Sequence, residues 1–393
     1  MRGRAKLKKS HRVGERPPFE CVALVLQGGG ALGAYQAGVY QALSEAEVPL
    51  DWIAGISIGA INSAIIAGNP PERRVERLRE FWETVTSDYR FDWAQANWPQ
   101  LFEGDFPNAA FTKFGSLMSA LRGQPGFFTP RVPLPWLQPL GSLAATSYYD
   151  TTDLRATLER LVDFDRINKE HEKLRFSVGA VNVLSGNFIY FDNTTHTIRP
   201  EHVIASGSLP PGFAATEIDG QYYWDGGLVS NTPLQWVLDT EPRLDTLAFQ
   251  IDLWSARGEF PTDLEEVEER QKEIRYSSRT RMTTDYMKRL QRARRALATL
   301  LKKLPKNLQD DPEVEVLRPL ADSKVCNIVH LIYRSRAYEN DAKDYDFSRS
   351  SMLGHWQAGY NDAVRTLRHP QIFERPPVLE GIHTFDLTRD GSV

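Results

Sequence analysis

The N-terminal part of the chain alternates between short apolar runs and helical patterns. Residues 22–26 form a continuous apolar run of strand length, and Tyr35, Val39, Leu43 and Ala46 then repeat at helical spacing. Residues 52–54 form a second short run, followed by the small residues Gly59, Ala60, Ser63, Ala64 and Ala67. Strands alternating with helices are typical of βαβ units, and small residues let a helix pack closely on a sheet. The pattern therefore predicts an α/β fold.

Elements of both kinds follow along the rest of the chain. Helices are predicted at 71–85, which begins with a proline, and at 154–162. Strands are predicted at 175–183, 187–191, 244–253 and 325–333, with a Ser-Gly turn joining the first two. A long C-terminal helix is indicated by the spacing of Met352, Trp356, Tyr360, Val364 and Leu367. The α/β pattern thus continues to the C-terminal part of the chain.

Residues 88–150 differ from their surroundings because they are rich in aromatic residues and proline. The spacing of Phe111, Phe114, Met118 and Leu121 predicts one short helix within this insertion. Two interpretations stay open. The insertion either covers the core, or it forms a lid or acyl-chain wall beside a catalytic site.

Length, charge and cysteine content narrow the class of protein. A chain of 393 residues can bury a large core, and its formal net charge of −4 gives no basic field that would indicate a nucleic-acid partner. The 2 cysteines are too few for a disulfide framework, and Cys21 is predicted to be a core residue. Residues 1–19 form a basic tail that we expect to be disordered, without the apolar segment of a signal peptide. We expect a cytoplasmic protein.

Two stretches without charged residues, 21–44 and 52–71, resemble membrane spans in composition. The first contains glycines and glutamines, and its periodicity changes from strand to helix in the middle. A membrane-spanning helix needs a continuous apolar stretch of about 20 residues. Both stretches are therefore predicted to be βα units.

Three short segments carry candidate catalytic chemistry. GGGALG (28–33) links the first strand to a helix, so its free backbone N–H groups can face a developing negative charge. GISIG (55–59) is a G-x-S-x-G turn whose glycines let the chain bend and expose the Ser57 hydroxyl. DGG (225–227) sets a carboxylate beside two glycines, which leaves space for another backbone. Together they predict a serine hydrolase with Ser57 as nucleophile and Asp225 as its base.

Nucleotide and metal sites fit the sequence less well. Gly28, Gly30 and Gly33 match G-x-G-x-x-G, but no acidic residue closes the second strand, because Asp51 precedes it. A G-K-[ST] motif is missing after the glycines, and the histidines show neither H-x-x-x-H nor H-E-x-x-H spacing. We therefore expect neither metal nor cofactor.

The combined motifs resemble those of the patatin-like phospholipases, which are lipid acyl hydrolases with a Ser–Asp dyad. That family combines G-G-G-x-[RK]-G, G-x-S-x-G and D-G-[GA], and ASGSLPPGF (205–213) matches its A-S-x-[SA]-x-P-x-x-F block. Leu32 replaces the usual Arg or Lys, a departure that concerns phosphate anchoring rather than the backbone donors. The resemblance covers residues 20–255 and implies a three-layer αβα hydrolase domain with a central, mostly parallel sheet. Residues 256–393 would be a C-terminal α/β extension, as in similar bacterial members.

The resemblance implies a mechanism through an acyl-enzyme. Ser57 would attack an ester carbonyl while Asp225 takes its proton, and water would later release the acyl group. The oxyanion hole would consist of backbone N–H groups of Gly28, Gly29, Gly30 and Ile58. A carboxylate with an ordinary pKa near 4 is a poor base for a hydroxyl, so burial must raise the pKa of Asp225.

Three other functions remain open at this point. The first is an α/β-hydrolase triad that uses His330, His355 or His383, which the early position of Ser57 and the DGG segment disfavour. The second is an esterase for other substrates on the same fold, such as an intracellular polyester depolymerase or a thioesterase. The third is a membrane-binding protein that has lost its activity, which the intact Ser57, Asp225 and glycine triplet disfavour.

The C-terminal region contains an acidic segment followed by a basic one. Residues 263–273 are rich in glutamate, whereas residues 287–306, from Met287 to Lys306, carry eight Lys and Arg residues and no acidic residue. Leu290, Leu297, Leu301 and Leu304 form one stripe of this predicted amphipathic helix, which Pro305 ends. One hypothesis is peripheral contact with an anionic membrane, at its inner face in the cell. The alternative is a helix whose leucines pack on the body and whose cations pair with the acidic segment.

Overall fold

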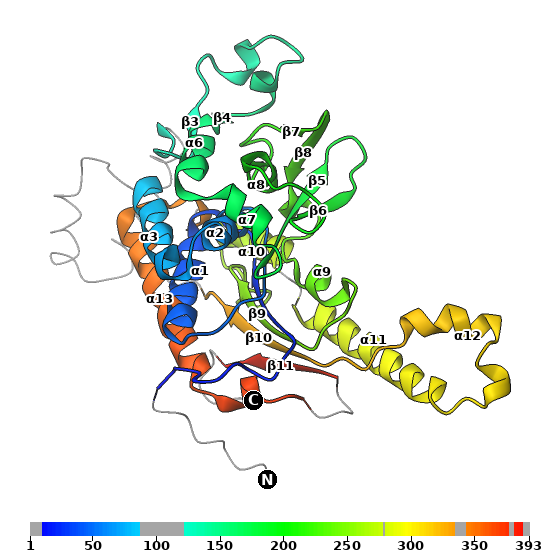
Figure 1. The fold of residues 1–393 in the computed structure, drawn as a ribbon. Helices are drawn as coiled ribbons and strands as arrows, with labels where there is room; N and C mark the ends of the chain where they lie inside the picture. The colour runs from blue at the N-terminus through cyan, green and yellow to red at the C-terminus, as the bar shows by residue number, and fades with distance from the viewer. Residues whose placement is uncertain (1–9, 87–121, 278–279, 335–342, 377–380, 388–393) are drawn as a thin grey trace.

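The computed structural model describes residues 10–86, 122–277, 280–334, 343–376 and 381–387. Nine strands of these residues form one sheet (Figure 1). From one edge its order is β11 (Ile382–Asp386), β10 (Cys326–Ile332), β9 (Thr246–Asp252), β1 (Cys21–Leu26), β2 (Trp52–Gly55), β5 (Arg175–Asn182), β8 (Gln221–Asp225) and β7 (Thr216–Ile218). β6 (Phe188–Asp192) also pairs with β5.

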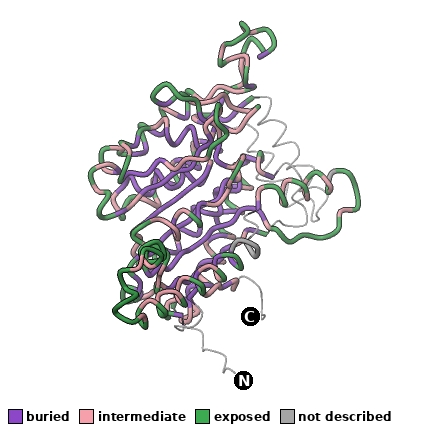
Figure 2. Tube along the Cα trace, turned by 90° about the vertical axis from the view of Figure 1, so that its right-hand side faces the viewer, coloured by how far each residue is buried: buried purple, intermediate pink, exposed green. Residues whose placement is uncertain are grey.

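The sheet is parallel from β11 through β5 and antiparallel beyond it. Alternate residues of β1 enter two separate cores, with Val22, Leu24 and Leu26 on one face and Cys21, Ala23 and Val25 on the other. A strand buried on both faces is apolar along its whole length. Figure 2 shows the strands buried in the centre and the exposed residues at the periphery.

Helices cover both faces of the sheet. One face carries α1 (Gly33–Glu45), α2 (Ile58–Ala67), α3 (Arg74–Val85) and α13 (Arg349–Leu367), and the other carries α9 (Leu234–Asp239) and α11 (Thr280–Leu301). Further helices are α6 (Thr152–Leu161), α7 (Phe164–Lys169), α8 (Pro200–Ser206), α10 (Leu264–Tyr276) and α12 (Pro312–Leu317). This three-layer arrangement confirms the predicted αβα fold with a mostly parallel sheet.

Most predicted elements coincide with observed ones. The helices predicted at 71–85 and 154–162 are α3, preceded by the 3-10 turn η2 (Pro71–Arg73), and α6. The four predicted strands are β5, β6, β9 and β10. The helix predicted from Phe111 to Leu121 lies outside the described residues. Cys21 is buried as predicted, and burial raises the pKa of its thiol to about 12.

The C-terminal region shares the core of the preceding residues. β10 pairs with β9 in parallel, and β11 extends the same sheet. α13 packs closely on α1, because a Cβ on Gly38 would lie 1.9 Å from the Trp356 carbonyl oxygen and one on Gly359 would lie 2.0 Å from the Tyr35 carbonyl oxygen. The described residues after 256 therefore complete the sheet and add α13 to one helical layer and α11 to the other.

The disorder predicted for residues 1–19 does not extend through the described part of that segment. The Val13 N–H donates to the Ala46 carbonyl at 3.1 Å, the Arg16 guanidinium pairs with Asp51 at 2.7 Å, and Phe19 is buried. These contacts fix residues 13–19 on the body of the protein and correct the prediction there. Residues 1–9 lie outside the described range.

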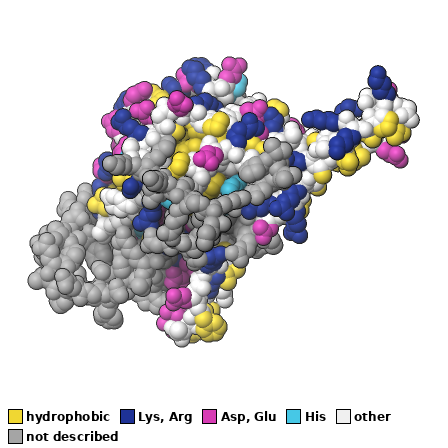
Figure 3. All heavy atoms as spheres, turned by 90° about the horizontal axis from the view of Figure 1, so that it is seen from below, with side chains coloured by type: hydrophobic (Ala, Val, Ile, Leu, Met, Phe, Trp, Pro, Cys, Tyr) yellow, Lys and Arg dark blue, Asp and Glu magenta, His cyan; other side chains and the backbone are white. Residues whose placement is uncertain are grey.

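α11 begins earlier than the basic segment predicted at 287–306. Thr284, Met287 and Gln291 recur at helical spacing and are buried, so the helix packs on the body through this side. Its distal part and α12 project as an arm, along which basic and apolar side chains gather (Figures 1 and 3). No helix among the described residues is both long and apolar enough to cross a membrane.

Candidate active site

Ser57 lies at the sharp turn between β2 and α2. Its backbone has φ 56° and ψ −124°, a left-handed conformation that costs a non-glycine residue roughly 1–3 kcal/mol. Gly59 permits the turn, because a Cβ there would lie 2.4 Å from the Leu26 carbonyl oxygen. The predicted G-x-S-x-G turn thus presents Ser57 at the carboxyl end of the parallel strands, directly before a helix N-terminus.

Asp225 is the last residue of β8 and is buried. Burial raises the pKa of its carboxyl group to about 7, against the lowering effect of hydrogen bonds from the Ser57 side chain and the Gly227 N–H. The Gly227 N–H donates to Asp225 Oδ1 at 2.7 Å. The structure therefore brings the two predicted catalytic side chains together and gives the carboxylate the raised pKa that a base for a hydroxyl needs.

The segment 205–213 holds both of these residues. Ser206 Oγ accepts a hydrogen bond from the Ser57 N–H at 3.0 Å, and the Ser208 carbonyl accepts one from the Asp225 N–H at 3.0 Å. The motif match alone assigns no role to this segment. Ser206 and Ser208 are buried, and their contacts fix the relative positions of nucleophile and carboxylate.

The glycine loop lies directly against Ser57. A Cβ on Gly28 would lie 2.9 Å from the Ser57 Cβ, so only glycine fits there. The Gly28 carbonyl oxygen accepts hydrogen bonds from Trp254 Nε1 at 3.0 Å and from Asn231 Nδ2 at 3.1 Å. Because a peptide plane is rigid, two donors on this oxygen turn the Gly29 N–H to the opposite side.

The candidate oxyanion donors differ in whether their N–H groups already donate to an acceptor within the protein. Among the described residues, the N–H groups of Gly29, Gly30 and Ile58 have no protein acceptor, whereas the Gly28 N–H makes a long bond of 3.4 Å to the Asn231 carbonyl. Unpaired N–H groups beside a nucleophile can stabilise a developing oxyanion. Leu32, in contrast, is fully buried in the core, as expected of a residue that packs inward.

A C-terminal segment, η8 (Lys343–Tyr345), covers the glycine loop. A Cβ on Gly30 would lie 2.3 Å from the Asp344 carbonyl oxygen. Lys343 is buried and pairs with Glu269 at 2.6 Å and Glu273 at 3.1 Å, both on α10. These ion pairs hold the segment at the site. Sequence patterns do not predict this role, because a lysine in a charged stretch is usually solvated.

Residues of α10 and of the preceding loop support the glycine loop from the same side. Gln27 donates through Nε2 to the Tyr276 carbonyl at 3.1 Å and accepts the Leu253 and Trp254 N–H groups at 2.6 and 3.0 Å. Asn231 Nδ2 also donates to the Tyr276 carbonyl at 2.9 Å. Through these hydrogen bonds, Gln27 and Asn231 connect the glycine loop to α10 in the C-terminal region.

The aromatic insertion packs beside this site at Phe127 and Phe128. Phe127 and Phe128 are buried, and the Phe128 ring lies 5.4 Å from Phe213 and 6.2 Å from Phe347. Phe213 ends the segment that holds Ser57 and Asp225. For Phe127 and Phe128 the structure thus agrees with the core-covering interpretation, while residues 87–121 lie outside the described range.

The three histidines of the alternative triad lie elsewhere. His330 is on β10, three strand spacings from β2, which is about 14 Å. His355 stacks edge-on against Tyr333, and His383 lies against Phe385. Among the described residues, the groups that lower the pKa of the Asp225 carboxyl are Ser57 and the Gly227 N–H, and no histidine acts on it. This geometry corresponds to a dyad.

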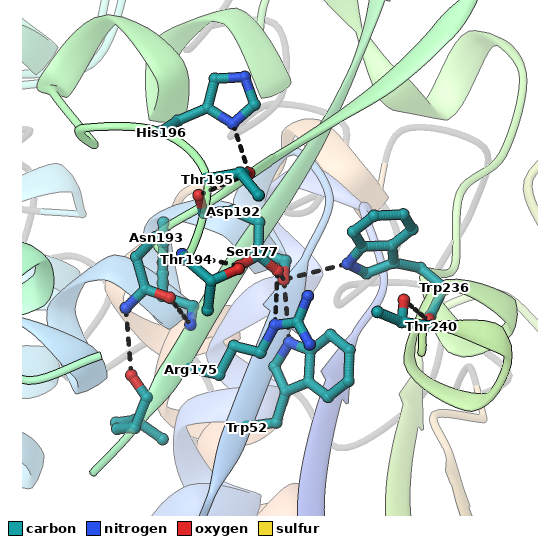
Figure 4. Close-up of polar contacts among 12 residues, drawn as sticks. Trp52, Arg175, Ser177, Asp192, Asn193, Thr194, Thr195, His196, Trp236 and Thr240 are labelled. Carbon is teal, nitrogen blue, oxygen red and sulfur yellow. Dashed lines mark hydrogen bonds and ion pairs between the residues drawn. The ribbon is translucent and has the colours of Figure 1, made fainter. Parts of the chain in front are cut away.

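A second Ser–Asp pair, Ser177 and Asp192, lies deep in the sheet (Figure 4). Ser177 Oγ donates to Asp192 at 2.6 Å and accepts from Trp52 Nε1 at 2.9 Å and Trp236 Nε1 at 3.2 Å. Arg175 pairs with Asp192 at 2.8 Å. Ser177 is fully buried, so this pair links β2, β5, β6 and α9 and is closed to a substrate.

No group of three or more acidic, histidine or cysteine side chains among the described residues is arranged to hold a metal ion. The candidate site consists of the nucleophile, the carboxylate and backbone donors. Such a set is sufficient for acyl transfer from an ester to water.

Two family models match this chain. Residues 24–238 match the family model described as "Patatin-like phospholipase", and residues 274–378 match one described as "Patatin phospholipase". Lysophospholipase nte1 of Aspergillus terreus is 53% identical over 57 residues, which are 14% of this chain and 4% of that protein. The human patatin-like phospholipase domain-containing protein 6 is 45% identical over 67 residues, 17% of this chain and 5% of that protein. The match thus spans a small part of these curated relatives.

Among solved structures, VipD from Legionella pneumophila aligns over 93% of this chain and 71% of its own, with 14% identity and a TM-score of 0.39. The family model, by comparison, covers more than half of the chain and includes Ser57, Asp225 and the glycine loop. On that match, the chain belongs to the patatin-like phospholipase family.

Proposed function

We propose that this chain is a lipid acyl hydrolase that cleaves carboxylic esters through Ser57 and Asp225. The observation that carries the proposal is the placement of Ser57 beside Asp225, where burial raises the pKa of the carboxyl group to about 7 against the lowering effect of the Ser57 side chain. The unpaired N–H groups of the glycine loop lie beside this pair. Family membership supports a lipid ester as the substrate.

The proposed reaction has two steps. Ser57 Oγ attacks the carbonyl carbon while Asp225 takes the hydroxyl proton, and the oxyanion accepts hydrogen bonds from Gly29 and Gly30, with those of Ile58 and Gly28 in reach. Collapse expels the alcohol, which receives the proton from Asp225, and leaves an ester on Ser57. Water then attacks this ester as Asp225 takes a proton from it, and the acid leaves as the proton returns to Ser57.

Total membrane lipid tests the substrate class. We expect the purified protein to release free fatty acids and lysophospholipids, both measured by mass spectrometry, and Ser57→Ala to release neither, because the acyl-enzyme cannot form. Turnover confined to a storage polyester or to acyl thioesters would move the assignment to another ester class. Release by Ser57→Ala would show that the chemistry lies elsewhere.

We propose further that the basic segment 287–306 attracts the enzyme to anionic lipid, at the inner face of the membrane in the cytoplasm. Arg292, Lys302, Lys303 and Lys306 are exposed and have no ion pair among the described residues. Arg294 pairs with Asp239 at 3.0 Å and Arg295 donates to the Lys324 carbonyl at 3.2 Å, so these two anchor the helix. The ion pairs of the described residues include none between the basic segment and residues 263–273, where Glu269 and Glu273 pair with Lys343.

A charge-removing variant tests this attraction. Replacing Arg292, Lys302, Lys303 and Lys306 with Gln should lower sedimentation with anionic vesicles by at least about tenfold, since each cation contributes about 1 kcal/mol near such a surface. Salt at roughly 0.5 M should release the wild type in the same way, and in cell fractions it should wash the enzyme from membranes. The variant's turnover of a soluble short-chain ester should stay at the wild-type level.

A matched control removes the same charge from another face. Arg73, Arg160, Lys169 and Lys173 are about half exposed or more and lie in surface ion pairs, which contribute little to stability. Replacing them with Gln should leave vesicle binding unchanged. Equal losses in both variants would mean that only net charge matters, and no loss in the arm variant would refute docking through 287–306.

A further inference from the structure

An exposed apolar loop protrudes from the molecule between β3 (Thr129–Pro130) and β4 (Tyr149–Asp150), at the top of Figure 1. We call residues 131–148 the apolar loop. Several of its large apolar side chains point to solvent: Val132 is 90% exposed, Trp136 and Leu137 are each 68% exposed, and Leu140 is fully exposed. Leu134 and Leu143 are also exposed. Apolar side chains gathered in this way mark an interaction site.

The apolar loop carries almost no charge. Its one ionic side chain is Arg131, which pairs with Asp150 at 2.8 Å at the base of the loop. Residues 132–148 contain no Asp, Glu, Lys or Arg. A protein partner would usually be met by a polar rim around the apolar centre. An uncharged surface that ends in Trp and Leu matches the interface of a lipid bilayer, where Trp is enriched.

Polar groups of the apolar loop are bonded within the loop. Gln138 Nε2 donates to the Pro133 carbonyl at 2.7 Å, Ser142 Oγ donates to the Pro139 carbonyl at 2.7 Å, and Thr146 Oγ1 donates to the Leu143 carbonyl at 2.8 Å. Its three prolines lack an N–H altogether. Entry into lipid is costly for unpaired polar groups, and these contacts lower that cost.

The base of the apolar loop adjoins the candidate active site. The Tyr148 and Tyr149 N–H groups donate to the Pro211 and Gly212 carbonyls at 3.1 and 2.9 Å. Residues 211 and 212 belong to the segment in which Ser206 holds the Ser57 backbone. The base of the apolar loop is therefore bonded to the segment that holds the nucleophile.

We propose that the apolar loop inserts into a phospholipid bilayer and sets the active site at the membrane surface. The proposal rests on the lipid substrate proposed above, and it concerns a different contact from that of the arm. The cations of the arm act on encounter and are screened by salt, whereas burial of Trp136 and Leu140 holds the bound state and is independent of screening.

The contribution of the apolar loop to membrane binding is measured with vesicles of neutral phosphatidylcholine in roughly 0.5 M salt, where the attraction of the arm's cations is screened. The variant Trp136→Ser/Leu140→Ser should bind them at least about tenfold more weakly than the wild type, because it removes the two apolar side chains whose burial in the bilayer favours binding. Its hydrolysis of vesicle lipid should fall with binding, while turnover of a soluble short-chain ester persists. The control Phe260→Ser/Leu264→Ser removes an aromatic residue and a leucine that are 90% and 83% exposed on another surface, and it should bind like the wild type.

A fluorescent label gives a second measurement. Cys21 and Cys326 are buried, so a dye should react selectively with the new thiol of Leu137→Cys. Insertion should shift the dye emission to shorter wavelength when phosphatidylcholine vesicles are added.

Unchanged emission together with unchanged binding of the Ser variant would overturn the proposal. Binding of the protein to polyester particles but not to bilayers would also overturn it. Loss of a wild-type dimer in the Ser variant, with vesicle binding intact, would assign the loop to a second copy of the chain. Vesicle binding without hydrolysis of any ester would refute the enzymatic function and leave the insertion standing.

Discussion

Ser57→Ala and Asp225→Asn are each expected to lower the turnover of a soluble short-chain ester on the order of ten-thousandfold or more, because nucleophile and base act as a unit. Both proteins should stay folded, since each change is nearly isosteric. Turnover is measured spectrophotometrically, and circular dichroism checks folding. A fluorophosphonate that labels active serines should react with the wild type and fail to react with Ser57→Ala.

Three kinds of control accompany these variants. Ser177→Ala breaks the enclosed Ser–Asp pair and should keep turnover per labelled site close to the wild type, because its hydroxyl is fully buried. His330→Ala, His355→Ala and His383→Ala should likewise stay active where they fold. Full inactivation of a folded protein by one histidine change would replace the dyad with a triad.

The pH dependence of kcat/KM should follow the ionisation of the Asp225 carboxyl group. Burial raises the pKa of Asp225 to about 7, and only its ionised form can accept the Ser57 proton. The kcat/KM of the wild type should therefore rise with pH through about 7 and level off above it. A rise centred near pH 4 would show that another group is the base.

The same shift predicts how Asp225 affects stability. Its pKa in the folded protein lies above that of the unfolded chain, so as pH rises from about 4 to about 7 the unfolded chain loses this proton first. Ionisation of Asp225 therefore destabilises the fold over this range, and the cost remains above it. Asp225→Asn should unfold at the same or a higher temperature than the wild type at pH 8, the trade-off expected of an active-site charge.

Sequence periodicity predicted the strands and helices, but not which of them lie next to one another in the fold. β9 and β10 were both recognisable as strands, yet only the folded chain shows that they pair in parallel. Periodicity is local, whereas pairing depends on which surfaces fit. The crossing of α1 and α13 depends on Gly38 and Gly359, two residues far apart in sequence that allow close approach only when they meet.

The site divides in the same way. The motifs that contain Ser57, Asp225 and the glycine loop need glycine for their backbone geometry. The catalytic role of these residues can therefore be predicted from the sequence. Lys343 has no such signature, because its importance comes from burial against α10 and from the contact of the following carbonyl with Gly30. The exposure of the apolar loop could not be predicted from the sequence either. The loop has the composition of a core segment, yet its large side chains are exposed to solvent.

Gly30→Val is expected to reduce turnover per labelled site on the order of a hundredfold or more, the cost of losing one oxyanion donor. Gly30 has φ 54°, and a Cβ there would lie 2.3 Å from the Asp344 carbonyl oxygen, so the larger residue must displace the loop. Gly186→Val is the matched control, because Gly186 has φ 70° but open space around it. It carries the same backbone strain without moving the loop and should keep its turnover.

Leu32→Ala separates the backbone of the loop from its side chains. Leu32 is fully buried, so its truncation should lower the free energy of unfolding by roughly 2–5 kcal/mol. Turnover per labelled site, measured well below the unfolding temperature, should nevertheless stay within about tenfold of the wild type, because the amide donors remain. Equal losses in Leu32→Ala and Gly30→Val would mean that side chains of the loop, rather than its N–H groups, stabilise the oxyanion.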